Sequence, residues 1–149
     1  MAEGIANQLL AKRIHFSVRF SSAGTSALEG QPASANAVAA AAERDIDITD
    51  HRSRLLNATM VRRADLIVTM GKKHRETVGV IEPAALAYTY RLAEFAGDAG
   101  ADVADPIGGG MDAYRRTFAI IHECIEGLVD ALADAGGFDG WRGAGGRNA

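Results

Sequence analysis

The basic side chains of Lys72, Lys73, His74 and Arg75 form a cluster that could bind an anion. They follow an apolar run, residues 66–70, which is typical of a strand buried on both faces in a parallel sheet. Because the carboxyl ends of strands in open α/β sheets face the ligand crevice, this position would suit an acidic ligand. The alternative is that the cluster is the solvated start of a helix.

A carboxylate and a glycine run share the loop predicted at residues 102–110. An Asp before Pro, as in Asp105-Pro106, is by itself a common turn residue. Gly108, Gly109 and Gly110 indicate a flexible loop and not a phosphate cradle, because no helix-opening Lys-Ser/Thr pair follows them.

Cys124 is the only cysteine of the 149 residues. An internal disulfide is therefore excluded, which fits a reducing compartment. Its position within an apolar helical pattern predicts that the thiol packs as a small hydrophobic group.

The chemical groups must be positioned by a domain of ordinary globular composition, with 48% apolar and 23% charged residues. Residues 1–80 carry 11 basic and 8 acidic residues, but the net charge of the whole chain is −3. The chain is therefore not basic enough to indicate nucleic-acid binding. We find neither a secretory signal pattern nor an apolar run near 18 residues, so no membrane span is expected. We expect a cytoplasmic protein.

Strand and helix patterns alternate along the chain, which predicts an α/β domain with an open parallel sheet flanked by helices. One side of the long final helix is marked by apolar residues that step by four and three. We expect a domain over residues 1–135 and a disordered, glycine-rich tail over residues 136–149. Helices are predicted at residues 2–12, 33–44, 57–63, 72–80 and 114–132, and strands at residues 14–20, 66–70 and 86–90.

Five segments, correctly ordered and spaced, resemble the bacterial low-molecular-weight protein tyrosine phosphatase family. They are Met1-Ala2-Glu3-Gly4, Ser22-Ala23-Gly24-Thr25, His51-Arg52-Ser53-Arg54, Ala64-Asp65-Leu66-Ile67-Val68-Thr69-Met70 and Asp105-Pro106-Ile107-Gly108-Gly109. The resemblance covers residues 1 to about 135 and implies the family's Rossmann-like α/β fold.

The family's defining motif, a C-x5-R-S phosphate loop after the first strand, is not in this sequence. In relatives a Met-Ala-Glu stretch follows that loop within a residue or two, and here it begins at Met1. Cys124 does not replace the motif, because Asp130 and not arginine stands six residues later. We therefore expect the chain as given to lack the first strand, which in the family is central and lies between the strands matching residues 14–20 and 66–70. Self-association could fill that slot.

The resemblance assigns roles to the candidate residues. Asp105 matches the general acid, which protonates the leaving phenolate and later activates water. Ser22 and His51 match polar residues that support the phosphate loop, and their partners are expected in the missing segment, which would leave both under-satisfied. Lys72, Lys73 and Arg75 are candidates for contacting a phosphopeptide.

The function that the resemblance implies is hydrolysis of phosphotyrosine through a cysteinyl-phosphate intermediate. The substrate would be a protein, such as a tyrosine kinase, and neither a metal nor a cofactor is expected. The chain as given is predicted to be inactive. Two alternatives stay open: a thiol-coupled arsenate reductase relative that uses an external thiol, and a non-catalytic relative that binds a protein partner or acts in regulation.

Overall fold

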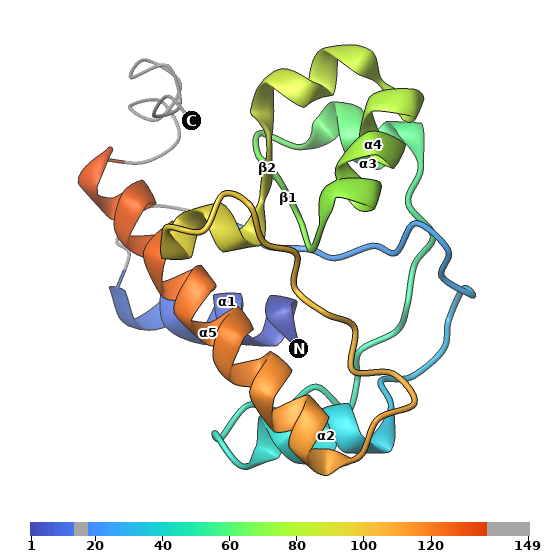
Figure 1. Ribbon diagram of the computed structural model, residues 1–149, viewed down its shortest axis with the longest axis vertical. Helices are drawn as coiled ribbons and strands as arrows, with labels where there is room; N and C mark the ends of the chain where they lie inside the picture. Colours follow the sequence, from blue (N-terminus) through green and yellow to red (C-terminus); the bar gives the residue numbers. More distant parts are fainter. Residues whose placement is uncertain (14–17, 137–149) are drawn as a thin grey trace.

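The computed structural model of the protein describes residues 1–13 and 18–136 (Figure 1). The predicted tail therefore lies outside the described residues, except for Gly136. The described elements are α1 (Ala2–Arg13), α2 (Ala35–Ala42), α3 (Ala58–Arg63), β1 (Ile67–Thr69), α4 (Lys72–Ile81), the 3₁₀ helix η1 (Pro83–Tyr88), β2 (Thr89–Arg91), the 3₁₀ helix η2 (Leu92–Ala96) and α5 (Met111–Asp134). All five predicted helices are confirmed, with small changes at their ends.

Strands β1 and β2 are parallel, with Ile67 opposite Thr89 and Thr69 opposite Arg91. The chain reaches β2 through α4 and η1, as a parallel pair requires a crossover connection. Successive side chains of β1 point to opposite faces. Ile67 packs with buried residues of α3 and α4, whereas Val68 packs with Leu128 and Leu132 of α5. The predicted strand with two buried faces is thereby confirmed.

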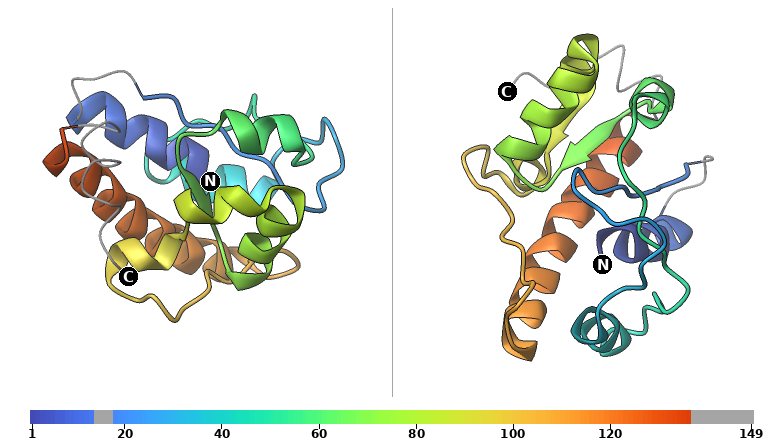
Figure 2. Two further views of the ribbon diagram at one scale, coloured as in Figure 1. Left: turned by 90° about the horizontal axis from the view of Figure 1, so that it is seen from above. Right: turned by 90° about the vertical axis from the view of Figure 1, so that its right-hand side faces the viewer.

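Helices cover both faces of this small sheet. Figures 1 and 2 show α3 and α4 on one side, and α1 and α5 on the other. Helix α1 buries an apolar face, because Ile5, Leu9 and Leu10 lie in the main core. The stripe along α5 is buried in the same way. This arrangement confirms the predicted α/β class.

Two strand predictions need correction. The strand expected at residues 14–20 falls partly outside the described residues, and residues 18–20 are not part of a strand. Val18 and Phe20 still pack against the core. Their apolar alternation therefore reflects the burial of their side chains, without the backbone pairing of a strand. The strand expected at residues 86–90 is mostly η1, which starts at Pro83, and only its end enters β2. Proline at the first helical position favours this start.

Gly127 allows α5 to lie very close to η2. A Cβ atom at this position would stand 2.0 Å from the carbonyl oxygen of Phe95. We expect Gly127→Ala to lower the free energy of unfolding by about 1–3 kcal/mol, because the steric conflict outweighs the gain of about 1 kcal/mol in helix propensity. Equilibrium unfolding in urea would measure the change. Gly100→Ala is the control, since its nearest neighbouring atom would be 3.4 Å away; equal stability of the two variants would contradict the prediction.

Candidate active site

Ser22 and His51 meet at the carboxylate of Glu3, in the first turn of α1. The backbone N–H and the hydroxyl of Ser22 both donate hydrogen bonds to Glu3 Oε2, at 3.0 and 2.5 Å. Nδ1 of His51 lies 3.8 Å from the same oxygen, within ion-pair distance when the imidazole is protonated. The two predicted supporting residues are therefore brought together by a third residue, which comes from a different part of the sequence.

The expectation that Ser22 is under-satisfied is wrong. Its hydroxyl and its N–H both have a partner in Glu3, whose carboxylate can accept several hydrogen bonds at once. The backbone N–H of His51 donates to the carbonyl of Ile48. Within residues 1–13 and 18–136, every buried side-chain nitrogen or oxygen has a hydrogen-bond partner.

Backbone contacts hold this cluster in place. The N–H of Gly24 donates to the carbonyl of Arg54, and the guanidinium of Arg54 returns a hydrogen bond of 2.9 Å to the carbonyl of Ser22. On the other side, a Cβ at Gly4 would stand 2.7 Å from a methyl carbon of Ile48. The absence of a side chain at Gly4 thus lets α1 start directly against the segment that leads to His51.

Asp105 lies on the loop that joins η2 to α5, and its side chain is exposed. Oδ1 of its carboxylate accepts a hydrogen bond of 3.0 Å from the N–H of Ile107, so the predicted turn at this Asp is confirmed. The middle of the loop passes the carboxyl end of β1, where the N–H of Val103 donates to the carbonyl of Met70 at 2.7 Å. A carboxyl group held in this way can exchange protons with a ligand at that end of the sheet.

The amino-terminal end of α1 is a second feature that suits an anionic ligand. In Figure 1 the amino-terminal end of α1 points toward the side along which residues 101–110 run. The amino-terminal end of a helix favours anions, because its free N–H groups and its dipole are positive. The structure therefore has an anion-attracting helix end at the start of α1 and a carboxyl group on an anchored loop.

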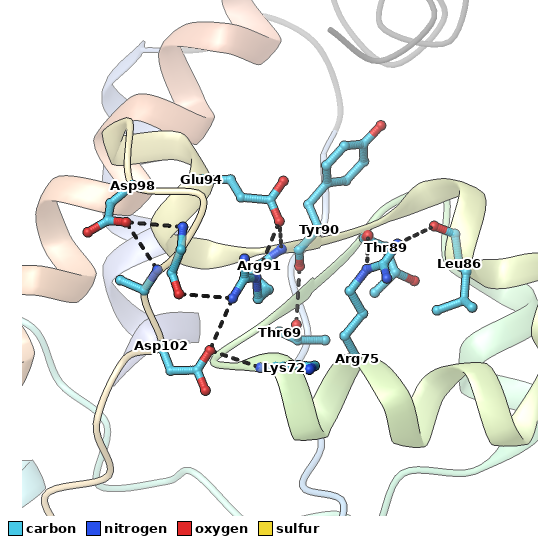
Figure 3. A network of polar contacts seen from close by, with 12 residues as sticks. Thr69, Lys72, Arg75, Leu86, Thr89, Tyr90, Arg91, Glu94, Asp98 and Asp102 are labelled. Atoms are coloured by element: carbon cyan, nitrogen blue, oxygen red, sulfur yellow. Dashed lines mark hydrogen bonds and ion pairs between the residues drawn. The ribbon is translucent and has the colours of Figure 1, made fainter. Parts of the chain in front are cut away.

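The three predicted basic residues fall into two kinds. Lys72 and Lys73 are exposed, and the ammonium group of Lys72 forms a long ion pair of 3.9 Å with Glu76. Arg75 is half-buried, and Figure 3 shows its guanidinium turned toward β2, where it donates to the carbonyls of Thr89 and Leu86 at 3.1 and 3.3 Å. Arg75 thus stabilises the packing of α4 against β2 and η1, and Lys72 and Lys73 are the exposed members of the three predicted substrate-side residues.

Cys124 is buried in α5, as its spacing predicted. Burial raises the pKa of its thiol, and the nearby charge of Glu123 acts in the same direction. A thiol nucleophile needs the opposite environment, one that stabilises the thiolate. Cys124 is therefore a packing residue.

The described part of the chain contains no group of three or more side chains suited to hold a metal ion. Among the same residues, no helix is both long and apolar enough to cross a bilayer.

Sequence reasoning missed Glu3 and Asp102. Glu3 belongs to one of the five segments, but nothing in the sequence says that its carboxylate turns toward residues 19 positions away. Asp102 accepts a hydrogen bond from Lys72, 30 positions away, and its only signal was its place just before Asp105. Both contacts are tertiary, so local pattern could not supply them.

Comparisons with known proteins agree with this arrangement. The sequence profile of the family described as "Low molecular weight phosphotyrosine protein phosphatase" matches residues 1–136. A probable low molecular weight protein-tyrosine-phosphatase, EpsP, from Ralstonia solanacearum is 32% identical over 136 residues, which cover 91% of this chain and 88% of EpsP. A protein-arginine-phosphatase from Geobacillus stearothermophilus is 32% identical over 117 residues, which cover 78% of this chain and 76% of that protein.

A solved structure has the same fold. Wzb of Vibrio vulnificus, in complex with benzylphosphonate, superposes with a TM-score of 0.79 at 28% identity and covers 88% of each chain.

Proposed function

Because the chain belongs to the low molecular weight phosphotyrosine protein phosphatase family, we propose that it hydrolyses phosphotyrosine in proteins when a C-x5-R-S segment stands ahead of Met1. In this proposal the described residues supply the general acid and the support of the phosphate loop. The added segment supplies the thiolate and the arginine.

The reaction proceeds in two displacements. The thiolate attacks phosphorus, the bond between phosphorus and the tyrosine oxygen breaks, and Asp105 gives its proton to the leaving phenolate. Asp105, now a carboxylate, then takes a proton from a water molecule that attacks the cysteinyl phosphate, which releases phosphate and restores the thiolate. The loop arginine and the amino-terminal end of α1 stabilise the phosphoryl oxygens in both steps.

The observation that carries the proposal is the position of Asp105. Its exposed carboxyl group sits on a loop tied to the carboxyl end of β1, where an α/β sheet binds its ligands. Glu3, Ser22 and His51 form a polar cluster at the start of α1, where the family's phosphate loop is followed by this helix. Their role in this proposal is to fix the entry of α1 and thereby the loop ahead of it.

A phosphorylated protein is the proposed partner, and a tyrosine kinase is the substrate we favour. Lys72 and Lys73 would contact acidic residues beside the phosphotyrosine, since both are exposed at the carboxyl end of β1. A cytoplasmic location belongs to the same proposal, because a catalytic thiolate has to stay reduced.

Phosphoarginine in proteins is the second candidate substrate. The relative that is a protein-arginine-phosphatase has the same 32% identity as EpsP, although over a shorter stretch. Both phosphotyrosine and phosphoarginine fit the described residues, because hydrolysis of either needs an anion site and a general acid.

The test uses an extended chain, in which an apolar strand and a C-x5-R-S loop are joined directly ahead of Met1. We expect its kcat/KM for a phosphotyrosine peptide to exceed that for the matched phosphoserine peptide by roughly 10²-fold, a ratio within the reach of differential transition-state binding. The physical reason is that phenolate is a better leaving group than an alkoxide.

A phosphoarginine peptide and arsenate with an external thiol are tested beside the two phosphopeptides. Preference for phosphoarginine would replace the first candidate by the second. Thiol-dependent arsenate reduction without peptide hydrolysis would favour the reductase alternative, and inactivity toward all four compounds would favour a non-catalytic role.

A further inference from the structure

Asp102 stands three residues before Asp105 and ties their common loop to two other elements (Figure 3). Its Oδ1 accepts a hydrogen bond of 2.9 Å from the backbone N–H of Lys72, the first residue of α4. The same oxygen lies 3.5 Å from a terminal guanidinium nitrogen of Arg91, the last residue of β2. One carboxylate thus joins the loop, the start of α4 and the end of β2.

The start of α4 depends on this carboxylate. Residue Gly71 takes the capping position of α4 and has no side chain that could accept a hydrogen bond from the helix. Asp102 accepts that bond from outside the helix, and its negative charge suits the positive helix end.

The missing side chain at Gly71 makes room for this contact. A Cβ there would stand 2.6 Å from the carboxylate carbon of Asp102. The backbone of Gly71 is extended, with φ −169°, which any residue can adopt. Glycine is therefore needed at position 71 to leave space for the Asp102 side chain, and not for its backbone flexibility.

Arg91 is itself held in a fixed direction. Its backbone N–H donates to the carboxylate of Glu94 at 2.9 Å, and its Nε lies 3.7 Å from that carboxylate. Its guanidinium also donates to the carbonyl of Gly100 at 3.2 Å. Asp98 accepts hydrogen bonds from Gly100 and Ala101, so the whole stretch that leads to Asp102 is anchored (Figure 3).

We propose that Asp102 is a positioning residue, which fixes the loop so that Asp105 is held at the carboxyl end of β1. The inference rests on the proposed function, in which Asp105 is the acid. The next residue after Asp102 is Val103, whose N–H donates to the carbonyl of Met70, so a release of Asp102 is expected to loosen this second anchor of the loop as well. Beyond Asp102, the described anchors before Asp105 are the bond from Val103 to Met70 and a long contact of 3.4 Å from Thr117 to Ala104.

The effect is expected mainly on rate, with a small loss of stability because the start of α4 loses its hydrogen-bond acceptor. The side chain of Asp102 is 52% exposed, and exposed ion pairs contribute little to folding. A misplacement of about 1 Å in a catalytic group can cost about 10²-fold in rate. A positioning role therefore predicts a kinetic defect in a protein whose melting temperature is lower by only about 2–4 °C.

The kinetic test compares Asp102→Ala with the unchanged extended chain. We expect kcat for phenyl phosphate to fall by roughly 10- to 100-fold, with KM within about twofold. The fall should be smaller with p-nitrophenyl phosphate, whose better leaving group needs less help from an acid. In the Asp105→Ala background the same change should alter kcat less than about twofold, because Asp102 acts through Asp105.

Asp130→Ala is the matched control, since Asp130 is also an exposed aspartate paired with an arginine, Arg13, at 3.1 Å. Its kcat should stay within about twofold of the unchanged chain. Equal losses from Asp102→Ala in both backgrounds, or equal losses with both leaving groups, would overturn the proposal. Should Asp105→Ala alone have no effect, the proposed acid would be wrong, which is a separate result.

A second arm needs no activity and uses the 149-residue chain. In Asp102→Ala we expect the backbone amides of Lys72 and Val103 to exchange with solvent at least about tenfold faster, while amides of α5 keep their rates. Unchanged exchange at both amides would overturn the inference whatever the kinetics show.

Discussion

The 149-residue polypeptide is expected to hydrolyse p-nitrophenyl phosphate no faster than buffer, and the extended chain at least roughly 10⁴-fold faster. The nucleophile and the arginine clamp both come with the added C-x5-R-S segment, and removal of a nucleophile usually costs more than removal of a general acid. The only thiol of the 149 residues is buried with a raised pKa, so it cannot take over the attack. Steady-state rates of the two purified proteins under the same conditions would measure the difference.

Cys124→Ser provides the control for this comparison. It should leave the activity of the extended chain within about twofold, because the thiol packs in α5 and does not reach a substrate. Turnover by the 149-residue polypeptide that survives repurification and disappears in Cys124→Ser would contradict the prediction. Size-exclusion chromatography of the same samples tests the predicted self-association, which should be weaker in the extended chain.

Asp105→Ala in the extended chain is expected to lower kcat for phenyl phosphate by roughly 10²–10⁴-fold, the usual contribution of general acid–base catalysis. The phenolate would have to leave without a proton, and the water of the second step would lose its base. Because p-nitrophenolate is a better leaving group, the loss of kcat should be smaller for p-nitrophenyl phosphate. Steady-state kinetics with the two esters would measure both losses.

Asp112→Ala is the matched variant for Asp105→Ala. Asp112 is an exposed aspartate a few residues further on, and its carboxylate pairs with Arg115 at 3.0 Å. We expect its kcat to stay within about threefold of the unchanged extended chain. If Asp105→Ala behaved like Asp112→Ala, Asp105 would be a turn residue only, as its hydrogen bond with Ile107 also allows.

The helices and the fold class could be predicted from the amino-acid sequence. Apolar residues that recur every three or four positions made one face of α1 and of α5 identifiable, since burial of one face imposes that period. The short apolar run at residues 66–70 identified β1, because a strand covered on both faces has no polar side. Asp105 was singled out differently, by its turn-forming dipeptide and its place among the five segments, and its role as the acid stays a prediction.

The partners of the polar side chains became known only from the packed structure. Ser22 was expected without a partner and has Glu3; Arg75 was expected at a ligand and donates to carbonyls of η1 and β2. Residues 18–20 have the apolar alternation of a strand and yet form none. Side-chain periodicity reports which side of an element is buried, but a hydrogen bond depends on which distant segment arrives opposite it. The partner segment is defined by the packing of the whole chain. The contacts of Glu3 and Asp102 could therefore not be predicted from local sequence.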